Sequence, residues 1–289
     1  MRSFKILLSL IVLISFAAPS LAQEKAPVPA LQNSAEPLEI SADNALEWDR
    51  LGKKYIAKGN AIAKQKDMEV HADTLVADYR ETKEKSSDIY KLTATGNVVL
   101  ISGGVNKAYG DNAVYEVDIA KATLTGGDLR IESPDMNITA KEKFEYYSNE
   151  GKMVAYGDPV ITNQGNTLTA DLVTAWTNPD SPKEKEQETA PSAKPQSKLG
   201  NLKRAEAEGN VVITTPKEKA TSDKGIYTAE NDTVELLGNV KLYQGENILQ
   251  GVRADMNLTT NLSRVYGAQG KGGRVKGVFF PNSQKQKDN

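Results

Sequence analysis

Gly96-Asn97-Val98-Val99-Leu100 is the stretch that decides the fold, because close variants of it recur along the chain. A Gly-Asn pair readily adopts positive φ and marks a turn, while the alternating branched side chains after it favour an extended strand. The other copies are Gly59-Asn60-Ala61-Ile62-Ala63, Gly127-Asp128-Leu129-Arg130-Ile131, Gly157-Asp158-Pro159-Val160-Ile161, Gly209-Asn210-Val211-Val212-Ile213 and Gly238-Asn239-Val240-Lys241-Leu242. Each copy predicts a turn and a short strand that begins there.

A second recurring element is a small residue followed by Asp, and it alternates with the first. Its copies are Ala42-Asp43, Ala72-Asp73, Gly110-Asp111, Ala170-Asp171, Ser222-Asp223 and Ala254-Asp255, with Ala140-Lys141 in an equivalent position. Successive Asp or Lys positions are 30, 38, 30, 30, 52 and 32 residues apart. A spacing this regular is typical of a repeat protein, in which each unit packs on its neighbours.

Insertions account for the two long intervals. The polar stretch from Arg80 to Asp88 lengthens the first. The segment Asn178–Lys198 lengthens the second; it holds four prolines and many charges, and alanine is its only apolar residue type. Such a segment buries too little apolar surface to offset the entropy lost on ordering, so we predict a disordered insertion there.

Strand patterning defines the fold class. Residues 38–43 read Leu-Glu-Ile-Ser-Ala-Asp, the alternation of a β-strand with one buried face. No segment shows a convincing helical period. We therefore predict an all-β protein of twisted antiparallel hairpin repeats over residues 38–280. A flexible linker is expected over residues 23–37 and a disordered tail over residues 281–289.

The first 22 residues have the features of a secretory signal peptide. Arg2 and Lys5 precede an apolar run from Ile6 to Ala18, and Ser20-Leu21-Ala22 supplies the small residues at which signal peptidase cleaves. The apolar run is too short to span a bilayer core of roughly 30 Å as a helix. We expect a cleaved signal (residues 1–22) and an exported mature chain from Gln23. An uncleaved membrane anchor is the alternative.

The composition argues against catalysis, metal binding and nucleic-acid binding. The 36 basic and 38 acidic residues are scattered, so the sequence has no basic stripe to bind phosphates. It has no cysteine and a single histidine, His71, which leaves few ligands for zinc and few candidates for a catalytic base. The recurring Asp positions indicate a structural role, although a glycosidase-like carboxylate pair stays open. We expect no enzyme activity and no cofactor.

The alternation of Gly-Asn-Val strands with small-Asp strands behind a signal sequence resembles the OstA-like family. The resemblance covers residues 38–280 and rests on Gly96-Asn97-Val98, Gly209-Asn210-Val211, Gly238-Asn239-Val240 and the small-Asp elements. It implies an open, V-shaped β-jellyroll in the periplasm that binds lipopolysaccharide and shields the acyl chains of lipid A in an apolar groove. It also implies bridging between inner-membrane and outer-membrane export components of similar fold, and it allows a head-to-tail homo-oligomer.

The apolar residues of the predicted strands are the candidates for such a groove. Each buried CH₂ group of an acyl chain is worth about 0.8 kcal/mol, so a continuous apolar surface favours lipid strongly. The candidate lipid-binding residues are Leu38, Ile40, Leu46, Val98, Leu100, Val211, Ile213, Val240 and Leu242. Ordinary packing between two sheets explains the same alternation equally well.

Exposed strand edges are expected at both ends of a hairpin stack, and such edges pair with other sheets. We place the end strands within Leu38–Glu47 and Val265–Phe279. Two other interpretations stay open. A parallel β-helix, as in an adhesin or a polysaccharide-active protein, has repeats of similar length. A β-repeat scaffold without lipid cargo has the same apolar pattern.

Overall fold

A computed structural model describes residues 37–83, 87–177, 202–260, 262–268 and 273–280. Every regular element in these ranges is a β-strand. The described part of the chain holds no helix long and apolar enough to cross a membrane. The predicted signal peptide, disordered insertion and C-terminal tail lie outside the described residues, as does the predicted linker except for its last residue.

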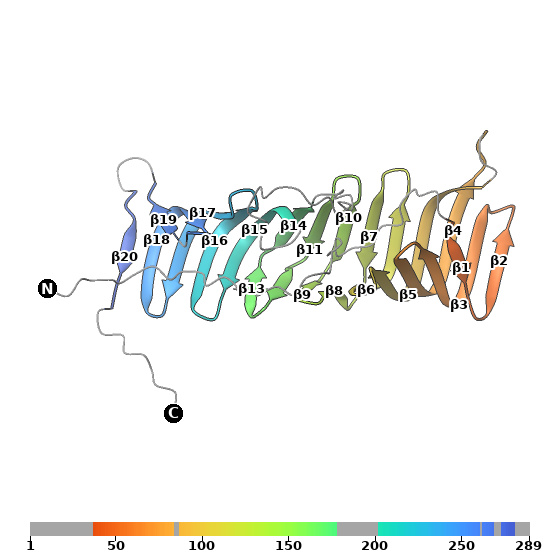
Figure 1. Cartoon of the computed structure of the whole chain (residues 1–289), viewed down its shortest axis with the longest axis horizontal. Helices are drawn as coiled ribbons and strands as arrows, with labels where there is room; N and C mark the ends of the chain where they lie inside the picture. Colours follow the sequence, from red (N-terminus) through yellow and green to blue (C-terminus); the bar gives the residue numbers. More distant parts are fainter. Residues whose placement is uncertain (1–36, 84–86, 178–201, 261, 269–272, 281–289) are drawn as a thin grey trace, which may run out of the picture.

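The strands pair into one antiparallel sheet that is folded into a long stack (Figure 1). In chain order they are β1 (Glu39–Ser41), β2 (Ala45–Asp49), β3 (Lys54–Gln65), β4 (Met68–Arg80), β5 (Asp88–Ser102), β6 (Asn106–Glu116), β7 (Lys121–Thr125), β8 (Leu129–Ser133), β9 (Met136–Ala140), β10 (Lys143–Tyr147), β11 (Lys152–Tyr156), β12 (Val160–Asn163), β13 (Asn166–Thr169), β14 (Leu172–Thr177), β15 (Leu202–Thr214), β16 (Glu218–Thr228), β17 (Thr233–Gln244), β18 (Asn247–Asn257), β19 (Leu262–Tyr266) and β20 (Lys276–Val278).

Two walls build the stack, and each is a continuous series of antiparallel pairs. The first wall has the order β2-β3-β4-β5-β6-β7-β10-β11-β14-β15-β16-β17-β18-β19. The second wall has the order β1-β3-β4-β5-β6-β8-β9-β12-β13-β15-β16-β17-β18-β20. The long strands β3–β6 and β15–β18 take part in both walls. The antiparallel pairing confirms the predicted fold of hairpin repeats and rules out a parallel β-helix.

Gly-Asn pairs make the bend by which a strand passes from one wall to the other. Gly96 and Asn97 lie in the middle of β5 with φ values of 79° and 48°, and the pairing of β5 with its neighbours shifts register there. The Asn97 Nδ2 donates hydrogen bonds of 3.1 and 3.0 Å to the carboxylate oxygens of Asp73 on β4. We call this contact the corner. Other corners join Asn60 to Asp43, Asn210 to Asp171 and Asn239 to Asp223.

The corner geometry corrects the predicted position of the turns. The positive φ of Gly-Asn is confirmed, but the pair lies inside a long strand and not at a hairpin. The hairpin between β3 and β4 turns at Lys66-Asp67, and the hairpin between β5 and β6 turns at residues 103–105. The sequence pattern does not distinguish a bend inside a strand from a hairpin turn, because both use glycine or asparagine at positive φ.

Three copies of the small-Asp element depart from the pattern. Asp111 accepts a 2.8 Å hydrogen bond from the backbone N–H of Gly127 and not from an asparagine side chain. At the central corner an ion pair replaces the asparagine–aspartate contact, because Lys141 Nζ lies 2.8 Å from the carboxylate of Asp158. The predicted copy at Ala254-Asp255 is not a corner. Gly251 has the corner position in β18, while Asp255 forms an ion pair with Arg253 in the first wall.

Inward-facing residues form two continuous apolar rows. In the first wall, cross-strand partners run through Leu46, Ala57, Leu75, Ala94, Ala113, Leu124, Phe144, Ala155, Val173, Ala207, Gly225, Leu236, Ala254 and Val265. In the second wall they run through Ile40, Ala63, Val70, Leu100, Ala108, Ile131, Ile138, Ile161, Leu168, Ile213, Ala220, Leu242, Leu249 and Gly277. Packing of the rows against each other holds the walls together.

Gly96→Ala should destabilise the fold more than Gly104→Ala. Both glycines have positive φ (79° and 75°), so alanine at either position costs about 1–2 kcal/mol of backbone strain. A Cβ at Gly96 would also collide with the Asp73 carboxylate, whereas nothing lies within 4 Å of a Cβ at Gly104. Chemical denaturation of the two variants measures the difference. Equal losses of unfolding free energy would contradict the role of the corner.

Candidate functional site

The interior between the walls is the candidate site, and most of the predicted groove residues line it. Five of them face inward and are at most 6% exposed: Val98, Leu100, Val211, Val240 and Leu242. Three more are partly buried and pack against the core: Leu38, Ile40 and Ile213. The structure thus brings these side chains to one interior, and their contact with lipid stays a prediction.

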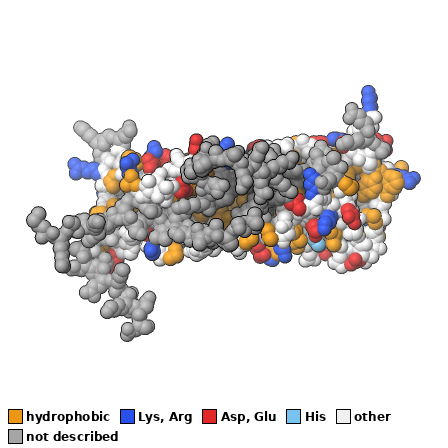
Figure 2. All heavy atoms as spheres, viewed as in Figure 1, with side chains coloured by type: hydrophobic (Ala, Val, Ile, Leu, Met, Phe, Trp, Pro, Cys, Tyr) orange, Lys and Arg blue, Asp and Glu red, His pale blue; other side chains and the backbone are white. Residues whose placement is uncertain are grey.

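Leu46 differs from the other candidates because it is 61% exposed. It pairs with Ala57 and therefore faces inward, but β2 ends the first wall and no further described strand covers its side chain. Trp48 lies on the same face of β2 and is also exposed. Hydrophobic side chains gather at this end of the stack (Figure 2). The apolar interior is therefore exposed at the end formed by β1 and β2.

A cavity of about 50 Å³ lies between the walls in the first half of the stack. Both walls contribute to its largely aliphatic lining, which includes Ile40, Ala63, Leu75, Ala94 and Leu100. A space of this size holds only a few water-sized groups. An acyl chain would therefore enter only if the walls moved apart.

Apart from Leu46, the inward-facing residues of the first wall are not among the predicted groove residues. These include Leu75, Leu92, Leu124, Phe144 and Leu236, and all of them lie outside the Gly-Asn-Val motifs. The signal that would have found several of them is the alternation that precedes each glycine, as in Leu92-Thr93-Ala94. If the glycine is taken as a bend inside one strand, the strand continues on both sides of it, and the alternation before the glycine identifies the inward-facing residues of the first wall.

The interior becomes polar toward the rims, where the hairpin turns lie opposite the corners. In the second wall, Ser102, Asn106 and Glu218 face inward beyond the apolar row and are at most 8% exposed. In the first wall the side chains near the rim include aromatic ones, and Trp48 Nε1 donates a 3.0 Å hydrogen bond to the hydroxyl of Tyr79. In the described ranges no strand pairing joins the two rims. The interior is thus apolar in its depth and able to hydrogen-bond at its rims.

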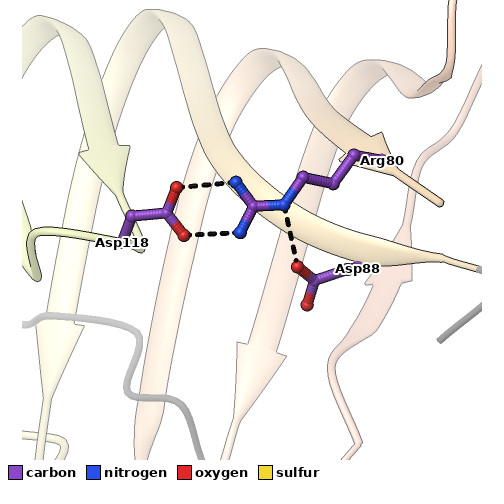
Figure 3. Close-up of polar contacts among 3 residues, drawn as sticks. All are labelled: Arg80, Asp88 and Asp118. Carbon is purple, nitrogen blue, oxygen red and sulfur yellow. Dashed lines mark hydrogen bonds and ion pairs between the residues drawn. The ribbon is translucent and has the colours of Figure 1, made fainter. Parts of the chain in front are cut away.

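An ion pair ties neighbouring hairpins together at the rim of the first wall (Figure 3). The Arg80 guanidinium donates two hydrogen bonds of 2.7 Å to Asp118 and one of 3.0 Å to Asp88. Hydrogen bonding to Asp118 is the main cause that raises the pKa of Arg80. Solvent screens so exposed a contact, so its effect is mainly to position the turns and adds little to stability.

A buried carboxylate lies on the outer face of the first wall. Glu145 is 5% exposed and accepts hydrogen bonds from Lys143 Nζ (2.8 Å), Tyr147 Oη (2.9 Å) and Tyr156 Oη (3.1 Å), while Lys121 Nζ lies 3.0 Å away. Burial alone would raise the pKa of Glu145, but these donors outweigh burial and hold the pKa at about 2. A carboxylate ionised so firmly has no proton to exchange near neutral pH, so the cluster has a structural role.

Potential ligands for a metal are dispersed. His71 lies on the outer face of the second wall, where its Nε2 is 3.1 Å from Glu69 Oε2. In the part of the chain that the structure describes, no group of three or more His, Cys, Asp or Glu side chains is placed to hold a metal ion. The site defined by the described residues is therefore an apolar interior with hydrogen-bonding rims.

The fold and this interior define a β-repeat protein built around an extended apolar core, and sequence comparison assigns its family. The model of the LptA/(LptD N-terminal domain) LPS transport protein family matches residues 39–152 and, a second time, residues 137–262. Together the two matches cover well over half of the chain, so the chain belongs to this family of lipopolysaccharide transport proteins. This confirms the predicted OstA-like, LptA-related membership, and the family is not one of enzymes.

A solved structure similar to this chain is that of LptH, the LptA homologous periplasmic component of the conserved lipopolysaccharide transport device from Pseudomonas aeruginosa. The sequence identity is 18%, the match covers 50% of this chain and 95% of LptH, and the TM-score is 0.39. No curated protein sequence matches the chain.

Glu145→Gln should reduce the loss of stability in acid. A carboxylate whose pKa is lowered by folding stabilises the protein above its unfolded pKa, and this stabilisation is lost as the pH falls through the folded value. A shift from 4.5 to about 2 corresponds to about 3 kcal/mol. At about pH 6 the wild type should therefore have a higher unfolding free energy than the variant. This difference should narrow as the pH falls from about 5 to about 2.

Glu150→Gln is the matched control, because the Glu150 side chain is 54% exposed and pairs only with Lys152 at the surface. This variant should change the unfolding free energy little at any pH. A gap for Glu145→Gln that is as wide in acid as near neutral pH would contradict a stabilising role for the ionised carboxylate.

Proposed function

We propose that the chain is a periplasmic lipopolysaccharide-binding transport protein that shields the acyl chains of lipid A between its two walls. The observation that carries the proposal is the pair of apolar rows, which extends through every strand of each wall without a charged side chain. Membership of the family supports lipopolysaccharide as the ligand. The signal-like residues 1–22 support export and a periplasmic location.

The rows would offset the cost of moving acyl chains out of a bilayer. At about 0.8 kcal/mol for each CH₂ group, several long chains face a barrier of tens of kcal/mol in bare water. The side chains in the rows are aliphatic or small with the exception of Phe144, so they offer burial without polar contacts that would hold the lipid in one place. The polar rims would leave the sugars and phosphates hydrated.

Room for an acyl chain between the walls requires the walls to move apart at the rims, and the corners are the natural hinges. In the described residues the walls are joined through strands that bend at the corners. A bend at Gly96 and Asn97 interrupts the pairing ladder by a register shift. The angle between the walls can therefore change there while the hydrogen bonds within each wall stay paired.

We also infer that the ends of the stack dock onto inner-membrane and outer-membrane export components of similar fold, or onto another copy of this chain. β2 runs from corner to rim and β19 runs from rim to corner, so the C-terminal end of one stack suits antiparallel pairing with the N-terminal end of the next. In the register that continues the first-wall row, Val265 faces Leu46 and Arg264 faces Glu47. Apolar contact inside and opposite charges outside support this head-to-tail arrangement.

A scaffold without lipid cargo is the second candidate function. Two observations favour it: Val98 and Val211 are each 1% exposed, and the cavity is small. In a scaffold the walls would stay packed against each other permanently. The experiment that separates the two functions is therefore a direct test for lipid between the walls.

A photoreactive side chain at Leu100, Val211 or Leu242 should form adducts with lipopolysaccharide in living Gram-negative cells. These side chains face inward, so acyl chains between the walls would lie in contact with them. Lys241 is the matched control, because it is exposed on the outer face beside Leu242. Blotting for lipopolysaccharide after irradiation detects the adducts. Folded, exported protein that gives no adduct at any inward position would favour the scaffold.

Charge reversal at either end should weaken end-to-end assembly, and combining the two reversals should restore it. Glu47→Arg and Arg264→Glu each place like charges opposite one another in the proposed register. In a mixture of the two single variants, every junction between unlike variants has opposite charges, so mixing should also restore assembly. Chemical cross-linking and light scattering measure the assembly. Lys241→Glu is the control and should have no effect, because Lys241 lies in β17, which is not an end strand of either wall. Unchanged assembly in both single variants would exclude this register.

A further inference from the structure

Four of the five largest fully buried side chains of the described residues lie in the centre of the stack: Phe144, Leu124, Ile131 and Ile138. The fifth, Leu236, lies in β17. Phe144 pairs with Leu124 in the first wall, and Ile131 pairs with Ile138 in the second. Both walls therefore present bulky residues at the same two positions along the stack. We call these four residues the constriction.

The cavity ends at the constriction. Its lining comes from β1 and from β3 to β7, and it reaches Leu124 without including any residue of β8 to β12. On the side of the cavity, the residues next to the constriction in the two rows are Ala113 and Ala108. On the far side, Phe144 is followed in the first-wall row by Ala155. Large side chains thus fill the interior at the centre of the stack, whereas the interior on the N-terminal side of the centre contains a cavity.

The family matches divide the chain at the same place. They overlap only over residues 137–152, which include Phe144 and Ile138. One family-sized unit therefore lies mainly before the constriction and the other mainly after it, while both walls continue through the centre by strand pairing.

We propose that the constriction divides the apolar interior into two acyl-chain compartments in series, with Phe144 as the residue that limits passage between them. The first compartment lies between the walls over β3 to β6, and the second over β14 to β18. An acyl chain that moves from one to the other must pass the Phe144 ring, which is 1% exposed and is the largest fully buried side chain of the described residues. The inference rests on the proposed function, since it assumes that acyl chains enter the interior.

Photo-crosslinking in a chain capped at one end tests the proposal. The sequence has no cysteine, so Val265→Cys provides a unique thiol at which a bulky maleimide can cover the C-terminal end of the interior. A photoreactive side chain at Leu100 reports on the first compartment, and one at Leu242 reports on the second. Purified capped protein is mixed with lipopolysaccharide and irradiated at increasing times. Adducts should appear first at Leu100 and later at Leu242.

Phe144→Ala should speed the appearance of adducts at Leu242 roughly tenfold, while the rate at Leu100 stays unchanged. Leu75→Ala is the matched control: it also shortens a buried side chain of the first-wall row but leaves the constriction intact, so it should not raise the rate at Leu242 relative to the rate at Leu100. Phe144→Leu keeps most of the packing and should give a smaller acceleration, which keeps the test valid if Phe144→Ala fails to fold.

Equal rates at Leu242 in wild type, Phe144→Ala and Phe144→Leu would overturn the two-compartment proposal and leave lipid binding itself intact. Wild-type protein that gives no adduct at Leu100 would instead overturn the proposed function. The two failures are therefore distinguishable.

Discussion

The bends at four of the corners depend on one contact, the hydrogen bonds from a corner asparagine to an aspartate that lies opposite it in the sheet. At Asn97 these bonds hold two consecutive residues at positive φ, a backbone conformation that is unfavourable without such support. The bend recurs at the same level in successive strands, so each long strand contributes to both walls and the apolar rows stay in register. Without the bends, the sheet would leave one apolar face in water.

Local alternation was sufficient to predict the strands, because period-2 patterning depends on neighbouring residues only. The antiparallel pairing was predicted from the Gly-Asn pairs taken as hairpin turns, and it is correct although these pairs lie inside strands. The role of Gly96 was not predictable in this way, because it depends on Asp73, which lies in the preceding strand. The exposure of Leu46 depends on its place in the last strand of a wall. The alternation predicts that Glu145 faces outward into solvent. Its burial was not predictable from the alternation, because lysine and tyrosine side chains from three strands cover it.

The centre of the stack differs from the parts on either side. Its corner is an ion pair between Lys141 and Asp158, its outer face carries the buried Glu145, and its inner face carries Phe144. All three lie in or beside the segment shared by the two family matches. Polar contacts outside and bulky packing inside thus join two family-sized units into one continuous body, and the interior narrows where they are joined.

The direction of the strands sets how the stack responds to tension. Hydrogen bonds between strands point across the strands and therefore along the long axis (Figure 1). A pull on the two ends loads every strand interface in series, so the interface with the fewest bonds yields first. β3 is joined to the N-terminal end through three residue pairs with β1 and five with β2, and β6 is joined to β7 and β8 through the same numbers, whereas β4 and β5 share eleven. An overstretched bridge would therefore part at an end or beside the centre, and its long-strand hairpins would stay paired.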